Sequence, residues 1–195
     1  LKRRLAYSTV SQLSYVVIAA AILAPLSVMG AVLHIAAHAF GKITLFFAAG
    51  SIYTAAHKTE VRQLDGIGRA MPWTMTAFAI GALSMIGLPP TAGFISKWYI
   101  LQGALQAEQT FAVAIIVAST LLNAGYFLPI VYSAFFKPAE NSVGAQHAPE
   151  IHEKHGEAPL PIVLALAITA TGTVLLFFFP GTLLELARQL IGSAS

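Results

Sequence analysis

The stretch from Val32 to Tyr53, VLHIAAHAFGKITLFFAAGSIY, is long and apolar enough to cross a membrane. It nevertheless contains His34, His38 and Lys42, which follow one another at four-residue spacing. On a helix, this spacing places the three side chains in one stripe that climbs roughly 12 Å. An ionisable side chain at membrane depth costs several kcal/mol unless it faces protein or water. We therefore interpret the stripe as part of a proton path.

The composition excludes an ordinary soluble domain. Hydrophobic residues make up 57% of the chain and charged residues 10%, and the mean hydropathy is +0.75. We predict an all-α, polytopic membrane helix bundle. The chain has no cysteine, which excludes disulfides, thiolate metal sites and cysteine nucleophiles. The net charge of +3 comes from basic residues at the ends of spans, so we expect no nucleic-acid partner.

Five membrane spans are predicted, one of them discontinuous. We expect the first four at about 5–26, 30–54, 72–105 and 110–136, followed by a hydrophilic loop at 136–158 and, over 159–195, a last span with an interfacial amphipathic tail. The third is far longer than the roughly 20 residues that a span needs. Gly87, Pro89 and Pro90 interrupt it, and prolines lack the N–H that a continuous helix uses. In transporters, such breaks lie at ion sites.

The distribution of basic residues predicts the orientation, because cytoplasmic segments are rich in Lys and Arg. With five spans and a cytoplasmic N-terminus, eight basic residues lie inside and one outside. Counting the broken span as two crossings instead places seven basic residues inside and two outside. The first arrangement fits better, so we expect the start of the chain on the cytoplasmic side.

Two lysines lie within spans, Lys42 and Lys97. Lys97 follows Pro90 by seven residues, and it is near enough to a helix end for its side chain to snorkel to the interface. Lys42 is too deep for that. We predict that both are buried and functional, with His34 and His38 as relay partners. The candidate accessory groups on the spans are Lys2, Ser11, Gln12, Tyr15, Asn123 and Tyr126.

Each of these polar residues also has a simpler interpretation. A single histidine in a span, or the polar face around Ser11 and Gln12, can serve helix packing alone. A metal site at the histidine pair would need a carboxylate, and none lies in these spans, so we expect no metal. The loop histidines His147, His152 and His155 lack the metalloprotease pattern, which favours a solvated connector. No pattern indicates a cofactor or a catalytic residue, and whether the chain is a subunit of an enzyme stays open.

Three segments resemble a known family: KRRLAYSTVSQLSY, HIAAHAFGKITLFFAAGSIY and MPWTMTAFAIGALSMIGLPPTAGFISKWYIL. They are similar to the second half of the proton-conducting antiporter-like subunits, which are shared by respiratory complex I (subunits L, M and N), membrane-bound hydrogenases and Mrp-type cation/proton antiporters. The resemblance covers nearly all of 1–135. It implies an inverted-repeat transporter fold with a core of 14 helices, of which 1–135 would form the second-repeat part.

The resemblance also implies roles for residues. The family's central proton path maps onto His34, His38, Lys42 and Lys97, and Lys2 matches a basic position in some members. The first repeat, with its lysine and glutamate, is absent from this chain, so a missing N-terminal half is an expected partner. Trp98 after the lysine looks closer to the D-type Mrp antiporter subunit than to the largest complex I subunit, where an acidic residue often follows.

These observations lead to one expected function and two alternatives. The first is proton translocation by a protein like the D-type Mrp antiporter subunit, with Na⁺ as the candidate exchanged ion. The second is a proton-pumping membrane-arm subunit of an NADH-quinone oxidoreductase or a related hydrogenase, and the third is a structural subunit that transports nothing. The expected partners are protons, the lipid bilayer and other subunits of a multisubunit complex. The expected location is the bacterial inner membrane.

Overall fold

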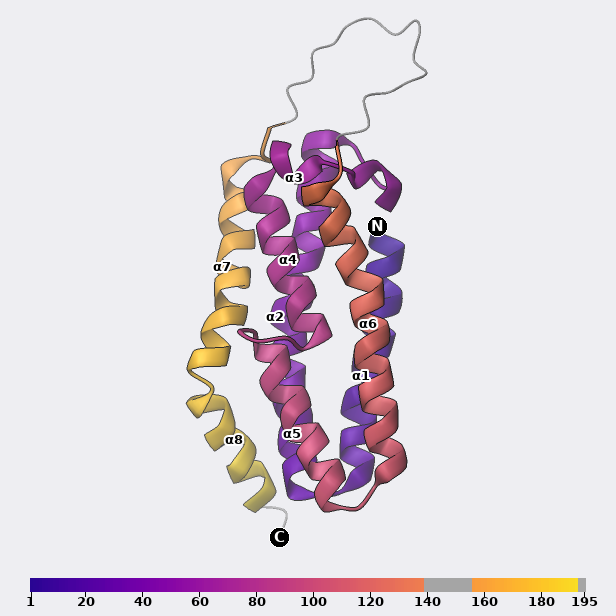
Figure 1. The fold of residues 1–195 in the computed structure, drawn as a ribbon. Coiled ribbons are helices and arrows are strands. Elements are labelled where there is room, and N and C mark those ends of the chain that lie inside the picture. The colour runs from indigo at the N-terminus through magenta and orange to yellow at the C-terminus, as the bar shows by residue number, and fades with distance from the viewer. Residues whose placement is uncertain (139–155, 193–195) are drawn as a thin grey trace, which may run out of the picture.

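The computed structural model describes residues 1–138 and 156–192, and the regular structure in them is helical throughout. This confirms the predicted all-α helix bundle, which is elongated along one axis (Figure 1). The helices are α1 (Lys2–Ile22), α2 (Pro25–Ala56), α3 (Ile67–Ala70), α4 (Pro72–Ile86), α5 (Ala92–Gln106), α6 (Thr110–Phe136), α7 (Leu160–Phe178) and α8 (Gly181–Gly192), with a short 3₁₀ helix, η1 (Val61–Leu64), before α3.

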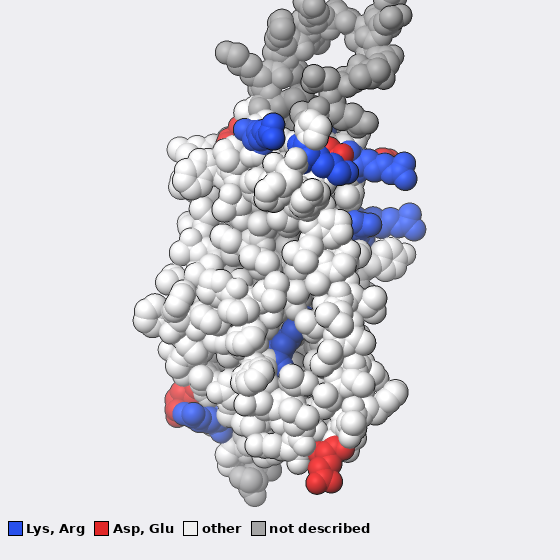
Figure 2. Space-filling view, in the orientation of Figure 1, with Lys and Arg blue, Asp and Glu red and all other residues white. Residues whose placement is uncertain are grey.

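Within the described residues, four helices are long and apolar enough to cross a membrane: α1, α2, α6 and α7. The helices α4 and α5 are each only 15 residues long. They follow one another in the same direction along the bundle (Figure 1), so together they make one further crossing. This confirms the discontinuous helix and disfavours the count that treated it as two crossings. Lys and Arg gather at the end of the bundle where α1 begins (Figure 2).

The turn between the first two helices comes earlier than the hydropathy pattern predicted. The first helix ends at Ile22, and Leu23 caps it with a left-handed backbone. The second helix starts at Pro25. A proline at this position loses no hydrogen bond, because the first N–H groups of a helix have no partner inside it. The expected limits at Leu26 and Gly30 are therefore wrong, since Pro25 begins a helix here.

Hydrogen bonds and close packing hold the end of α4 against the start of α5. Gly87 ends α4 with a φ of 90°, which favours glycine, and donates its N–H to the Leu83 carbonyl at 2.8 Å. Gly93, in the first turn of α5, donates its N–H to Ser84 Oγ at 3.3 Å. A Cβ at Gly93 would lie 1.8 Å from the Ser84 carbonyl oxygen. The start of α5 is thus packed directly onto the end of α4.

The long helix α2 packs against α5 through glycines. A Cβ at Gly30 would lie 2.6 Å from the backbone nitrogen of Ile100, and one at Gly103 would lie 2.3 Å from the backbone nitrogen of Ser27. Small residues at such crossings let two membrane helices approach closely. Ser27 also donates its Oγ–H to the Ala19 carbonyl at 2.7 Å, which ties α2 to α1. These contacts pack both α1 and α5 against the first part of α2.

Glu157 joins the start of α7 to the start of α4. Its carboxylate accepts hydrogen bonds from the Trp73 N–H (2.7 Å), the Thr74 N–H (3.2 Å) and the Thr74 hydroxyl (2.6 Å). The first N–H groups of a helix have no intrahelical partner, and a carboxylate there is favourable. Residues 139–155 of the predicted hydrophilic loop, including His147, His152 and His155, lie outside the described residues.

The glycine crossing yields a stability prediction. Replacing Gly30 by Ala should destabilise the bundle by about 1–3 kcal/mol, because the new methyl group meets the backbone of α5. Gly50→Ala is the matched control, since it lies on the same helix and a Cβ there meets nothing within 4 Å. The midpoint of thermal unfolding in detergent should fall for Gly30→Ala and stay or rise for Gly50→Ala. Equal midpoints for the two variants would contradict this packing.

Candidate functional site

Lys97 on α5 reaches back across the helix break. Its Nζ donates hydrogen bonds to the Met85 carbonyl at 2.8 Å and the Ile86 carbonyl at 3.0 Å. These carbonyls belong to the last turn of α4, where no intrahelical N–H is available and the helix dipole favours a cation. The same Nζ lies 4.4 Å from the centroid of the Tyr15 ring on α1. Only 6% of Lys97 is exposed, which agrees with its predicted burial.

Lys42 on α2 is also 6% exposed, and its amine binds α1. Its Nζ donates a hydrogen bond to the Leu5 carbonyl at 2.9 Å and another to the Ser8 hydroxyl. Lys42 does not snorkel, because its amine bonds to the interior face of a neighbouring helix. The two buried lysines therefore lie against the same helix, one near Ser8 and the other near Tyr15.

Neither lysine has a carboxylate partner in the part of the chain that the structure describes; the ion pairs found there are Lys137–Asp65 and Arg188–Glu185. Carbonyl and hydroxyl oxygens accept hydrogen bonds from an ammonium and from a neutral amine alike. Both lysines are therefore held by neutral acceptors in the described part of the chain.

The two histidines of the α2 stripe lie between the lysines. His34 Nδ1 forms a hydrogen bond with Ser96 Oγ at 2.9 Å, and its ring centroid is 5.5 Å from that of Tyr15. The His34 and His38 rings stack with centroids 6.4 Å apart. The Nε2 atoms of both rings are buried, and neither has a hydrogen-bond partner among the described residues. The structure therefore brings His34, His38, Lys42 and Lys97 together along the interface of α2 with α1 and α5.

The buried face of helix α1 includes three polar side chains, Ser8, Gln12 and Tyr15. Its buried residues are Leu5, Ser8, Gln12, Tyr15 and Ala19, which recur every three or four positions on one face. Val10, Leu13 and Val17 are exposed. A membrane helix with this distribution uses its polar face for protein contacts and its apolar face for lipid or another helix. The buried face of α1 thus supplies polar contacts to both lysines.

The accessory candidates lie in three places. Gln12 and Tyr15 lie at the break, and Asn123 on α6 supports Tyr15 by donating Nδ2–H to its hydroxyl at 3.4 Å. Two others make contacts elsewhere: Lys2 lies 5.1 Å from the Tyr53 ring centroid, and Tyr126 donates its hydroxyl to the Arg4 carbonyl. Ser11 is half-buried and faces a groove between α1 and α6.

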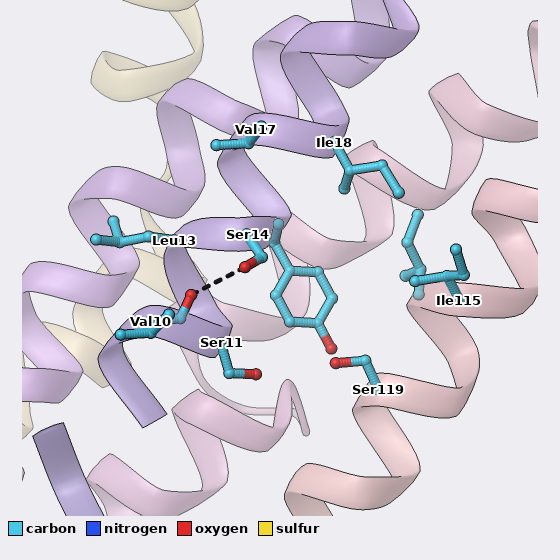
Figure 3. A pocket seen from close by; sticks show the side chains of 10 residues that line it. Val10, Ser11, Leu13, Ser14, Val17, Ile18, Ile115 and Ser119 are labelled. Atoms are coloured by element: carbon cyan, nitrogen blue, oxygen red, sulfur yellow. Dashed lines mark hydrogen bonds between the residues drawn. The ribbon is translucent and has the colours of Figure 1, made fainter. Parts of the chain in front are cut away.

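That groove has a volume of about 590 Å³, and the residues that line it carry no charge. Figure 3 shows Ser11 and Ser14 on α1 and Ile115 and Ser119 on α6 at its walls. Lys97 lines a separate, smaller pocket of about 180 Å³ between α5 and α6. Figure 2 shows Lys or Arg atoms at the bottom of a hollow halfway along this face. The groove between α1 and α6 is thus not the hollow that Lys97 lines.

Several groups at the site had not been predicted from the sequence. Ser8 was visible on the polar face of the first span, at four-residue spacing from Gln12, but nothing paired it with Lys42. Ser96 directly precedes Lys97. Its pairing with His34 could not be predicted, because the two residues are far apart in the sequence. The remaining partners are main-chain carbonyls, which no side chain in the sequence marks: those of Leu5, Met85 and Ile86. For Met85 and Ile86 the following prolines are a partial indication, because they end α4 and leave its last carbonyls without N–H partners.

No cluster of three His, Asp or Glu side chains that could hold a metal ion occurs in residues 1–138 and 156–192. The groups that line the site are lysine amines, imidazoles, hydroxyls, an amide and main-chain carbonyls. These groups can bind, orient and transfer protons.

Comparison with known proteins gives a consistent result. Residues 1–143 match the family described as NADH:quinone oxidoreductase/Mrp antiporter, transmembrane. The chain is 39% identical to the NADH-quinone oxidoreductase subunit N of Desulforudis audaxviator, over 91% of this chain and 36% of that protein. It is 31% identical to the D-type subunit of the Na⁺/H⁺ antiporter of Alkalihalophilus pseudofirmus, over 86% of this chain and 33% of that protein.

A solved structure of the Mrp complex from Dietzia sp. DQ12-45-1b has the same fold, with a TM-score of 0.82, 22% identity and coverage of 94% of this chain and 40% of that one. The chain thus spans about a third of the length of the relatives it matches. The family match covers most of the chain, and the broken helix and the buried lysines lie within it. The chain belongs to the transmembrane family of NADH:quinone oxidoreductase and Mrp antiporter subunits.

Proposed function

We propose that this chain translocates protons within an antiporter-like membrane subunit, with Lys97, Lys42, His38 and His34 as the groups that carry the proton. The observation that carries the proposal is the pair of buried lysines bound only by neutral partners within the described residues. A lysine held by a carboxylate would be fixed in the charged form, whereas these two can load and release a proton as their surroundings change.

The two histidines give the proton a route along α2. A neutral imidazole accepts a proton at one nitrogen and releases one from the other. The ring centroids of His34 and His38 are 6.4 Å apart, which is too far for a direct hydrogen bond, so the proposed route includes a water molecule between them. Their buried Nε2 atoms are the groups that such a water would bind. In this proposal a proton passes between Lys97 and Lys42 by way of His34 and His38.

The proposed division of the chain follows from this path. Residues 1–135 would form the second-repeat part of the subunit, 136–158 a hydrophilic connection, and 159–195 a last span with its amphipathic tail. The first repeat, other subunits and the lipid bilayer would be its partners. The basic end of the bundle would face the cytoplasm of a bacterium, and the membrane would be its inner membrane.

Two processes can drive such a path. Exchange against Na⁺, as in a protein like the D-type Mrp antiporter subunit, is our first interpretation, and the name of the Alkalihalophilus relative supports it. Redox-driven pumping in a complex I-like or hydrogenase-like complex is the second, and the name of the relative with 39% identity supports it. A purely structural subunit would need neither lysine for transport.

The lysines provide the central test. Lys97→Ala and Lys42→Ala in the full-length gene product should each abolish proton transport, because each removes a proton carrier, while the complex still assembles. Lys137→Ala is the control, since that lysine is half-exposed and pairs with Asp65. Proton flux is measured with a pH-sensitive dye in membrane vesicles, and assembly by native electrophoresis. Normal flux in both variants would exclude the proposed path, and lost assembly without a flux effect per complex would indicate a structural subunit.

Orientation can be tested by cysteine labelling, because these 195 residues contain no cysteine. Thr59→Cys is at the basic end of the bundle and Gln109→Cys is in the exposed turn between α5 and α6 at the other end. An impermeant maleimide applied to intact spheroplasts should label position 109 and not position 59, and inside-out vesicles should reverse the result. Labelling of position 59 in spheroplasts would invert the proposed orientation.

The driving process can be tested with ions and reductant. If Na⁺ exchange is correct, Na⁺ added to acidified inside-out vesicles should release protons without any redox substrate, and Lys97→Ala should remove this response. If redox pumping is correct, acidification should follow the electron donor and be indifferent to Na⁺. The same vesicle preparation serves both measurements.

A further inference from the structure

The two buried lysines do not meet, and α1 spans the gap between them. Lys42 binds Ser8 and Lys97 lies over Tyr15, which are seven residues apart on α1. Seven residues of helix rise roughly 10 Å, whereas one hydrogen bond spans about 3 Å. A proton that moves between the lysines on the α1 side therefore needs an intermediate group. The buried face of α1 has one polar side chain between these two positions, Gln12.

Gln12 is already bonded to the Lys97 end of this gap. Its Nε2 donates a hydrogen bond to the Met85 carbonyl oxygen at 3.1 Å, and Lys97 Nζ donates to the same oxygen at 2.8 Å. The amide and the amine are thus neighbours on one acceptor at the helix break. Gln12 is fully buried, so its amide has no access to bulk solvent.

The other end of the amide has no partner. Gln12 Oε1 is buried and accepts no hydrogen bond from any described residue, although buried polar atoms are nearly always paired with protein or water. One helical turn away on the same face is Ser8, whose hydroxyl contacts Lys42. Side chains four residues apart on a helix are roughly 5–6 Å apart, a distance that one water with two hydrogen bonds can bridge.

We propose that Gln12 is a positioning residue that holds a water between Lys97 and Ser8, and that this water carries protons between the two lysines on the α1 side. The inference rests on the proposed function, and it makes the α1 side the faster of two connections, the other being the histidine route on α2. In the transfer, an N–H bond of the Lys97 ammonium breaks and an O–H bond forms on the water. The water passes a different proton to Ser8 Oγ, whose own proton goes to the neutral Lys42 amine. The net change is an amine at Lys97 and an ammonium at Lys42.

The role of Gln12 in this step is geometric. An amide does not take up the proton itself, but its Oε1 accepts one hydrogen of the water and so directs the water's remaining hydrogen and lone pairs. The bond from Nε2 to the Met85 carbonyl fixes the amide beside Lys97. Losing the acceptor would leave the water unoriented, while losing the donor would only loosen the amide.

Four variants test this role. Gln12→Met keeps the length of the side chain and has neither group of the amide. Ser8→Ala leaves the amide and its bond to Met85 in place but removes the hydroxyl that receives the water's proton, Ser8→Thr restores a hydroxyl there, and Ser14→Ala is the control on α1. Ser14 is exposed and bonds only to the Val10 carbonyl of its own helix. Proton flux per assembled complex is measured in membrane vesicles of the full-length gene product, as for the lysine variants. Gln12→Leu takes the place of Gln12→Met if the latter assembles poorly.

We expect Gln12→Met and Ser8→Ala each to slow proton flux roughly tenfold or more, and Ser8→Thr and Ser14→Ala to stay close to the unmodified protein. Flux of Gln12→Met within twofold of the unmodified protein overturns the proposal. Normal flux in Ser8→Ala also overturns it, because the water would then have no hydroxyl that relays its proton to Lys42. Normal flux in Lys97→Ala and Lys42→Ala would instead reject the proposed function, so the two failures are distinguishable.

Discussion

The arrangement of the polar site depends on the contact of Lys97 with the end of α4. A helix that ends inside a membrane leaves carbonyl groups without N–H partners, and no bulk water is there to satisfy them. The prolines after Gly87 cannot supply the missing donors, because proline has no N–H. Lys97 supplies them from the other half-helix. The lysine and the carbonyls of the break thus satisfy each other's hydrogen bonds.

The neighbouring helices carry residues that fit this contact between Lys97 and the end of α4. Tyr15 presents its ring to the Lys97 amine, and Gln12 shares the Met85 carbonyl with it. On α2, glycine at position 30 and the hydroxyl of Ser27 bring α1, α2 and α5 close enough for these contacts to form. The packing of small residues and the polar site are thus parts of one arrangement: where the backbones approach most closely, the polar side chains meet.

Much of this fold could be predicted from the sequence, because span length and prolines are strong physical signals. The length of the third span and Pro89 with Pro90 predicted the discontinuous helix, and four-residue spacing predicted that Lys42 and its histidines share a face. The partners of the lysines could not be predicted, because main-chain carbonyls look the same at every position. The turn before Pro25 was also misplaced, since hydropathy does not change there while backbone geometry does.

The two ends of α4 meet opposite charges. The carboxylate of Glu157 caps its first N–H groups, and the amine of Lys97 caps its last carbonyls. A helix carries the equivalent of about half a positive charge at its N-terminus and half a negative charge at its C-terminus. With the proton on Lys97, the electric field of α4 is compensated at both ends. In the proposed function, loss of the proton would leave the carbonyl end uncompensated, and the field of the helix would favour the return of a proton to the break.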